Sequence, residues 1–187
     1  MHREPLLALL GRYRPTEPHQ QDAHARLLAF VREHPDCLSR DLAVGHITSS
    51  AWIENHDCTC ALLTHHRKLG KWLQLGGHVD GEPDVLKSAI REAQEESGID
   101  TIEPVHSEIF DLDIHEIPAY GGTPAHFHYD VRFWLRATQD VPYVVSEESI
   151  DLAWVTPSEF SGYPTDESVV RLHRKWLNVR RADARPQ

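Results

Sequence analysis

The sequence predicts an α/β domain in which helices cover the faces of a sheet. Short runs rich in β-branched and aromatic residues lie on both sides of one central helical segment, residues 83–97. Further helical patterns occupy both ends of the chain, residues 4–36 and 166–180. Strands flanking a helix, with more helices at the ends, are typical of a layered α/β architecture.

The composition indicates a folded, acidic protein. The chain has 187 residues, 40% of them hydrophobic and 26% charged, which suits one globular domain with an extension. Its 29 acidic and 19 basic residues give a net charge of −10. General nucleic-acid binding is not expected, because it needs basic residues that neutralise phosphates. The 14 histidines are an unusual supply of groups that bind metal ions or transfer protons.

The cysteines and the apolar runs indicate a cytoplasmic protein without a membrane segment. Cys37, Cys58 and Cys60 cannot form a complete disulfide set, and Cys58 and Cys60 lack the two-residue spacing of a zinc or redox motif. Reduced thiols are therefore expected. No stretch approaches the roughly 18 apolar residues that a membrane-spanning helix needs.

The chain divides into an extension, a main domain and a tail. Residues 1–40 are predicted to form a helical extension packed on the domain, and Pro35 ends its last helix. These helices are candidates for capping the sheet or for a homodimer contact. The main domain covers residues 41–182, and residues 183–187 are expected to form a disordered tail.

Six strands, the central helix, one loop and one short helix are expected in the main domain. Early strands are predicted at 45–54, 60–66 and 71–75, and later ones at 107–117, 126–137 and 150–155. The central helix has Pro83 near its start and Gly98 after its end. A Pro- and Gly-rich loop spans 117–125, and a short helix is expected at 156–160.

Three glutamates on the central helix are the strongest chemical signal. Glu92, Glu95 and Glu96 are three and four positions apart, so they project within about one quarter of the helix circumference. Like charges at this spacing repel by a few tenths of a kcal/mol, and a divalent cation would reverse that repulsion. Oxygen ligands favour Mg²⁺ or Mn²⁺ over zinc. The alternative is a solvated acidic face.

The surrounding residues resemble the Nudix box, G-x5-E-x7-R-E-U-x-E-E-x-G-U, in which U is aliphatic. Counted from Gly77, the matching positions are Arg91, Glu92, Glu95, Glu96, Gly98 and Ile99. Six such matches arise by chance with a probability on the order of 10⁻⁷ per starting position. Two positions depart from the pattern. Ala93 stands at the aliphatic position, and Pro83 stands where the first Glu belongs, with Glu82 one place earlier; whether Glu82 takes that role is left open.

The resemblance implies a Nudix-type α/β/α sandwich around a mixed sheet. It also implies a hydrolase that cleaves a nucleoside diphosphate linked to another moiety, by water attack at phosphorus. Glu92, Glu95 and Glu96 would hold one or more Mg²⁺ or Mn²⁺ ions with the carbonyl of Gly76 or Gly77, and Glu95 and Glu96 would be catalytic. Arg91 would orient a carboxylate, and Gly98 would cap the helix.

Further candidates lie outside the box. Glu148, in the loop before the last strand, is predicted to act as a base or additional ligand, as an acid on a late loop often does in this family. Arg67, Lys68 and Lys71 form a basic island beside the box strand and are candidates for phosphate binding. The alternatives are an ordinary charged loop and an ordinary hairpin loop.

Histidines and acids alternate on two of the later strands. His126, His128 and Asp130 share one face, and Asp111, Asp113 and His115 share another. If the strands pair, they form a polar wall that is predicted to bind substrate or an accessory metal ion; the alternative is a solvated face. His78, directly after the glycine pair, is expected to lie near the metal ions and contact substrate.

Two other functions compete with hydrolysis. Pro83 in the box suggests a non-catalytic nucleotide sensor on the same fold. The Gly77-His78 pair suggests an isoprenoid diphosphate isomerase of the same superfamily, but that chemistry needs a proton-donating Cys beside the His, where this chain has glycine. The sequence does not distinguish among nucleotide-linked substrates.

Overall fold

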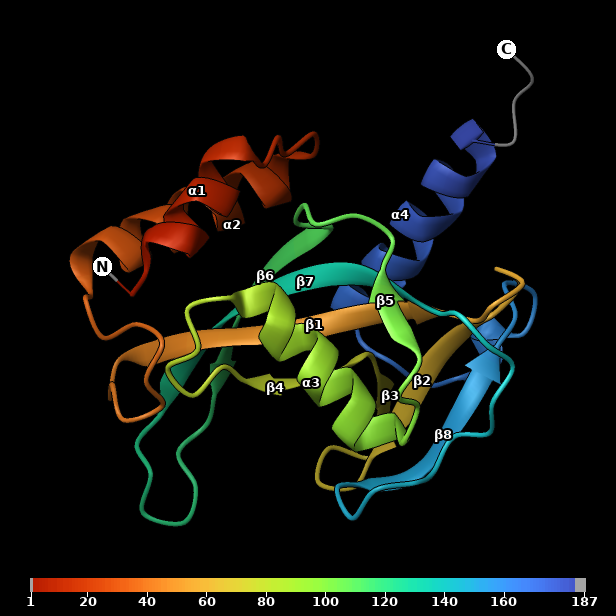
Figure 1. Ribbon diagram of the computed structural model, residues 1–187. Helices are drawn as coiled ribbons and strands as arrows, with labels where there is room; N and C mark the ends of the chain where they lie inside the picture. The colour runs from red at the N-terminus through yellow and green to blue at the C-terminus, as the bar shows by residue number, and fades with distance from the viewer. Residues whose placement is uncertain (1, 184–187) are drawn as a thin grey trace.

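The computed structural model describes residues 2–183, in which an eight-stranded mixed sheet carries helices on both faces (Figure 1). The helices are α1 (Glu4–Arg12), α2 (Pro18–Glu33), α3 (Val85–Ser97) and α4 (Glu167–Asp183), with a single 3-10 turn η1 (Phe160–Gly162). The strands are β1 (Gly45–Glu54), β2 (Ala61–His66), β3 (Lys71–Leu73), β4 (Leu75–His78), β5 (Ile102–Pro104), β6 (Asp111–Ile117), β7 (His126–Ala137) and β8 (Ser149–Val155). The predicted α/β/α fold with an N-terminal helical segment is confirmed.

Strand β1 organises the sheet. It pairs in parallel with β7 along its whole length and in antiparallel fashion with β4 and β2, and every one of its residues is buried. Its side chains alternate between the two faces. The Ser49 hydroxyl donates to the Val85 carbonyl at the start of α3, 2.6 Å away. The Ser50 hydroxyl donates to Asp130 on β7, 2.7 Å away. One face of the sheet therefore carries α3. The other, beneath α4, combines buried polar side chains such as Ser50 with a hydrophobic cluster that contains Trp52 and Trp176.

The expected strands are present, with shifted boundaries. Strands β1 and β7 begin and end where the sequence predicts. The predicted strand at 71–75 is divided between β3, which pairs with β2, and β4, which pairs with β1. The strand expected from residue 107 begins only at Asp111, and the three-residue strand β5 was not expected. The short helix predicted at 156–160 is wrong in position, because its residues form a turn leading into η1.

Helix α3 has well-defined ends. It begins after Asp84, whose side chain accepts a hydrogen bond from the backbone N–H of Lys87, a capping interaction that satisfies a free N–H of the first turn. It ends at Gly98, which adopts the left-handed conformation with φ 68°. Ala89 and Ala93 are fully buried against the sheet. These small side chains let the helix lie close to the strand that carries the glycine pair.

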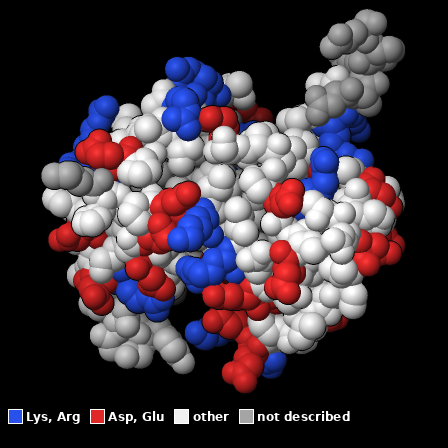
Figure 2. Space-filling view, viewed as in Figure 1, with Lys and Arg blue, Asp and Glu red and all other residues white. Residues whose placement is uncertain are grey.

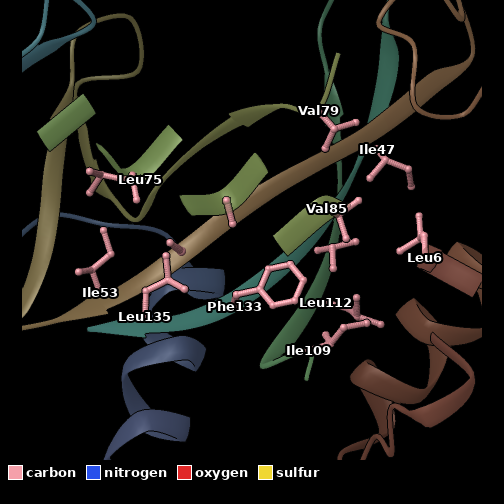
Figure 3. Packing of buried hydrophobic residues seen from close by; sticks show 14 of the residues in the cluster. Leu6, Ile47, Ile53, Leu75, Val79, Val85, Ile109, Leu112, Phe133 and Leu135 are labelled. Carbon is pink, nitrogen blue, oxygen red and sulfur yellow. The ribbon is translucent and has the colours of Figure 1, made fainter. Parts of the chain in front are cut away.

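The N-terminal helices pack on the main domain. Figure 3 shows Leu6 of α1 reaching the cluster that contains Val85 and Leu112. From α2, Phe30 stacks on Tyr129 of β7 with ring centroids 3.8 Å apart. Complete burial of a Leu such as Leu6 contributes about 1.5–3 kcal/mol. The division at residue 40 stays a prediction, and residues 184–187 of the predicted tail lie outside the described residues. No described helix is both long and apolar enough to cross a membrane.

The face beneath α4 carries a buried network of charges. Arg132 of β7 donates to Asp130 at 2.7 Å and contacts Asp113 of β6 at 3.3 Å. Arg171 of α4 donates to Asp111 and Asp113 of β6. Strands β6 and β7 pair antiparallel, which meets the condition set for a shared polar wall. Their acids lie inside the protein rather than on a solvated face.

Candidate functional site

The glycine pair of β4 lies against the glutamates of α3. The backbone N–H of Gly76 donates to Glu96 Oε1, 2.9 Å away. At Gly77, an added Cβ would lie 2.5 Å from Glu92 Oε2. Two glycines in succession therefore leave space in which carboxylates approach the strand backbone.

The three glutamates of α3 differ in exposure. Glu96 is 9% exposed, whereas the side chain of Glu92 is 15% and that of Glu95 is 61% exposed. Burial raises the pKa of Glu96 to about 8; the hydrogen bond from Gly76 opposes the rise, and the charges of Glu92 and Glu148 add to it. Burial also raises the pKa of Glu92, against the opposing charge of Arg91. Both carboxylates are therefore held where their charge is unfavourable without a cation.

Arg91 connects the helix to the glycine strand. It contacts Glu92 at 2.8 Å and donates to Glu95 at 3.0 Å. Its guanidinium also donates to the carbonyl of His78, 2.8 Å away. Figure 2 shows basic side chains lying beside acidic ones on the face that carries α3. This geometry is compatible with the orienting role predicted for Arg91.

The donor set suits a hard divalent cation. Carboxylate oxygens and the carbonyl oxygens of the glycine pair are the ligands that Mg²⁺ and Mn²⁺ prefer. Burial is the main cause of the raised pKa values of Glu92 and Glu96, and a bound cation would stabilise the charged form of both carboxylates. Among the described residues the three carboxylates do not gather within 4.8 Å of one another, and Glu95 is the most exposed of them, so a site using all three glutamates needs a different Glu95 rotamer.

Glu82 lies at the start of α3. Its carboxylate pairs with Lys87 at 2.9 Å and accepts a hydrogen bond from the backbone N–H of Asp84 at 3.1 Å. Glu82 therefore helps to organise the first turn next to Pro83. Its use as a metal ligand stays an open prediction.

Arg67 holds the loop that carries Glu148. Its guanidinium donates to the carbonyls of Glu147 at 2.9 Å and Ser149 at 2.6 Å, and its backbone N–H donates to the Glu148 carbonyl. The charge of Glu148 raises the pKa values of both Glu92 and Glu96, so this side chain is electrostatically coupled to the glutamates of α3. Lys71 is exposed at the start of β3. Phosphate binding by Arg67 and Lys71 stays a prediction.

Several histidines line a cavity of about 650 Å³. Among its lining residues are Arg40, His46, Lys68, His78, His126 and His128. Because successive side chains of a strand point to opposite faces, Gly77 faces α3 and His78 faces this cavity. The structure thus brings together His78, His126 and His128, three of the predicted substrate-binding residues. Their substrate-binding role stays a prediction.

His46 was missed by the sequence analysis, and Asp130 lies elsewhere than expected. His46 is the register partner of His128 across the parallel pair β1 and β7, a relation that only strand pairing reveals. Asp130 is 2% exposed and accepts hydrogen bonds from Ser50 and Arg132 in the buried network. Asp130 is only two residues from His128 along β7, but its side chain belongs to the buried charge network beneath α4 and not to the lining of the histidine cavity.

Comparison with known proteins identifies the family. Residues 45–177 match the NUDIX domain, a span that contains both the glycine strand and α3. This protein belongs to the Nudix family. It is accordingly a Nudix hydrolase, and the sequence-based recognition is confirmed. A comparison with curated proteins finds none that matches.

Solved Nudix structures share the fold. The Ap4A hydrolase of C. elegans in a binary complex has a TM-score of 0.59 at 18% identity, covering 73% of this chain and 98% of that one. A Nudix-family hydrolase from Clostridium perfringens has a TM-score of 0.55 at 22% identity, with coverage of 72% and 97%. The MutT protein of Methanosarcina mazei Go1 has a TM-score of 0.55 at 20% identity, with coverage of 77% and 99%. At these identities the likeness establishes the fold alone.

A methyl group at Gly77 is expected to weaken metal binding with little effect on stability. In Gly77→Ala the new Cβ would collide with the Glu92 carboxylate, which can rotate away. We expect Mn²⁺ affinity, measured by electron paramagnetic resonance of free Mn²⁺, to fall about 10-fold. The free energy of unfolding should change by less than about 1 kcal/mol. Gly11→Ala, where no atom lies within 4 Å, is the control. Equal Mn²⁺ affinity in Gly77→Ala and the parent would contradict the placement of the metal site between Gly77 and Glu92.

Proposed function

We propose that this Nudix hydrolase is a divalent-metal-dependent pyrophosphohydrolase that cleaves a nucleoside diphosphate linked to another moiety. The observation that carries the proposal is the burial of Glu92 and Glu96 against the glycine pair, with the pKa of both carboxyl groups raised. Carboxylates held this way repel a pyrophosphate as well as each other. A cation between protein and substrate removes both repulsions.

Glu92, Glu95 and Glu96 would hold Mg²⁺ or Mn²⁺ with the carbonyl of Gly77. When bound, such an ion neutralises charge on the pyrophosphate and lowers the pKa of the attacking water. Arg91 keeps the Glu92 carboxylate in place through their 2.8 Å contact. All three glutamates therefore act as metal ligands in our proposal, and Glu95 and Glu96 are also the residues that we propose to be catalytic.

Glu148, Arg67 and the histidine cavity have further roles in this proposal. Glu148 accepts the proton of the attacking water, and Arg67 positions the loop that carries it through hydrogen bonds to the neighbouring carbonyls. The histidine cavity receives the moiety linked to the diphosphate. Lys68 of its lining supplies positive charge for an anionic group, whereas the charge of Arg40 is balanced by Asp80.

A hydrolysis panel tests the proposal. Nucleoside triphosphates, nucleotide sugars, ADP-ribose and dinucleoside polyphosphates are each incubated with Mg²⁺ or Mn²⁺ in ¹⁸O-labelled water. We expect at least one to be cleaved at its pyrophosphate with ¹⁸O in a phosphate product, and no cleavage with excess chelator. Saturable nucleotide binding without any metal-dependent cleavage would instead identify a sensor. Isomerisation of an isoprenoid diphosphate without hydrolysis would identify an isomerase.

Glu148→Gln is expected to reduce kcat about 10-fold with little change in KM, because an exposed carboxylate that accepts a proton acts mainly in the transition state. Steady-state kinetics on the substrate found by the panel measures the change. Glu147→Gln is the matched control, since the adjacent Glu147 contributes to neither raised pKa at the site. Equal loss in both variants would show a general effect of loop charge rather than a role for Glu148.

We also propose a cytoplasmic location, which the three free cysteines support.

We further propose that the protein forms a homodimer through its N-terminal helices. The buried leucines of these helices, including Leu6, Leu10 and Leu27, belong to the core of their own chain, so a dimer would have to use their outer faces. Light scattering at several protein concentrations measures the assembly state.

A further inference from the structure

Three histidines from neighbouring strands meet in the cavity on the side of β4 turned away from α3. His46 of β1 is the register partner of His128 of β7. His78 of β4 is paired with Thr48, two residues along β1 from His46 and on the same face. One ring nitrogen from each histidine lies within 4.8 Å of the others. The juxtaposition is built by paired strands rather than by a loop.

His46, at the centre, has no protein partner. It is 3% exposed, and neither ring nitrogen makes a hydrogen bond with any described residue. A buried polar group without a partner is unfavourable by about 1–3 kcal/mol. Two unsatisfied nitrogens on one buried ring therefore indicate a missing ligand. The imidazole rings of His78 and His128 are centred 4.9 and 4.8 Å from that of His46.

The rings are suited to donate lone pairs. Burial first, and then the charges of His78 and His126, lower the pKa of His46 to about 4. Burial first, and then the charges of neighbouring histidines, also hold the pKa of His128 well below its usual value. Neutral imidazole is the form that ligates metal ions. At neutral pH these histidines are therefore available as nitrogen ligands without losing a proton.

We propose that His46, His78 and His128 form a binding site for a borderline divalent transition metal ion such as Zn²⁺, distinct from the carboxylate site on α3. Imidazole nitrogens select such ions, whereas Mg²⁺ prefers oxygen. Three protein ligands leave a fourth position open, as in zinc sites that bind water or substrate. That position faces the cavity, where Lys68 favours an anionic group, while Arg40 is paired with Asp80.

The geometry needs only side-chain adjustment. Tetrahedral coordination at about 2.0–2.1 Å places ligand nitrogens roughly 3.3 Å apart, so the rings must close in from their present separation. His78 and His128 are half-buried and can rotate, while the strand backbones stay fixed. His126, whose ring centre lies 5.2 Å from that of His46, is the nearest further imidazole. Its Nδ1 lies 2.9 Å from the Pro124 carbonyl, which leaves Nε2 free.

Zinc binding by the full-length, untagged chain tests the inference independently of hydrolysis. Chelator-stripped protein is dialysed against Zn²⁺ in the presence of excess Mg²⁺, which occupies oxygen sites. We expect one Zn²⁺ per chain, and Co²⁺ in its place should give the intense visible absorption of four-coordinate nitrogen ligation. His78→Asn and His128→Asn should each weaken Zn²⁺ binding at least about 100-fold. The exposed His106→Asn is the control and should bind like the parent.

The outcomes separate this site from the hydrolytic one. Glu92→Gln with Glu96→Gln should leave Zn²⁺ binding intact, so loss of hydrolysis in that variant does not affect the inference. Two histidine variants are used so that one still reports if the other fails to fold, as judged by circular dichroism without metal. Full Zn²⁺ affinity in a folded His78→Asn or His128→Asn chain would overturn the proposal. So would a six-coordinate Co²⁺ spectrum, or equal loss of binding in His106→Asn.

Discussion

Glu96→Gln is expected to lower turnover of the nucleotide-linked substrate at least about 100-fold while the fold persists. Glu96 is the most buried glutamate of α3, and its carboxylate accepts the hydrogen bond of the Gly76 backbone N–H. The amide keeps an oxygen that can accept the Gly76 hydrogen bond, but it cannot supply the negative charge that a divalent ion needs. Steady-state kinetics with Mg²⁺ and with Mn²⁺ measures the loss.

The same substitution is expected to stabilise the protein when no divalent ion is present. The pKa of Glu96 is about 8 in the folded state, above its ordinary value of 4.5. Between these pH values the folded protein holds a proton that the unfolded chain has released. Stability therefore falls as pH rises from about 4.5 to 8. The stability of Glu96→Gln does not decrease in this way, because glutamine does not ionise. At about pH 8 with chelator, its free energy of unfolding should exceed that of the parent by on the order of 2 kcal/mol.

Opposite signs for activity and stability distinguish a ligand role from a structural one. Urea unfolding at several pH values, with and without Mg²⁺, measures stability, and added Mg²⁺ should stabilise the parent more than the variant. Glu103→Gln on β5, where the residue is exposed, is the control for loss of a surface charge. If Glu96→Gln and Glu95→Gln both kept parental turnover, the carboxylate site would not be the hydrolytic centre.

The sequence was most informative where local signals and a motif coincide. Gly98 predicted the end of α3 because the left-handed cap favours glycine, and the box located the carboxylates on that helix. The division of residues 71–75 between β3 and β4 was not predictable. It arises because the two halves pair with different strands, β2 and β1, a tertiary choice that leaves no local pattern.

The composition of the histidine cavity was likewise only partly predictable, because it depends on which strands pair. Alternation placed His126 and His128 on one face, and the structure agrees. Nothing in the local pattern near His46 linked it to His128, since 82 positions separate these residues and only the β1–β7 register joins them. Alternation likewise grouped Asp130 with the histidines. It could not predict that α4, from the end of the chain, covers the network containing Asp130 and leaves the histidine end open.

Arg132→Met is expected to destabilise the protein by about 3–5 kcal/mol. Arg132 is 1% exposed, and it neutralises Asp130 and Asp113, at 2.7 and 3.3 Å. Methionine fills similar space but leaves these buried carboxylates short of positive charge. An unpaired buried charge is more unfavourable than the pair that it replaces was favourable. Chemical denaturation at pH 7 measures the change in the free energy of unfolding.

The pH dependence of Arg132→Met separates the loss of charge from the loss of packing. In the parent, burial alone would raise the pKa of Asp113, but the hydrogen bond with His115 and the charges of Arg132 and Arg171 hold it below its usual range. That stabilisation is present above the unfolded pKa and is lost only in stronger acid. Without Arg132 the Asp113 carboxyl group protonates at higher pH, so the deficit should shrink as pH falls from 7 towards 4. A deficit independent of pH would indicate lost packing instead. Arg26→Met removes an exposed ion pair with Asp22 and should change stability by less than about 0.5 kcal/mol.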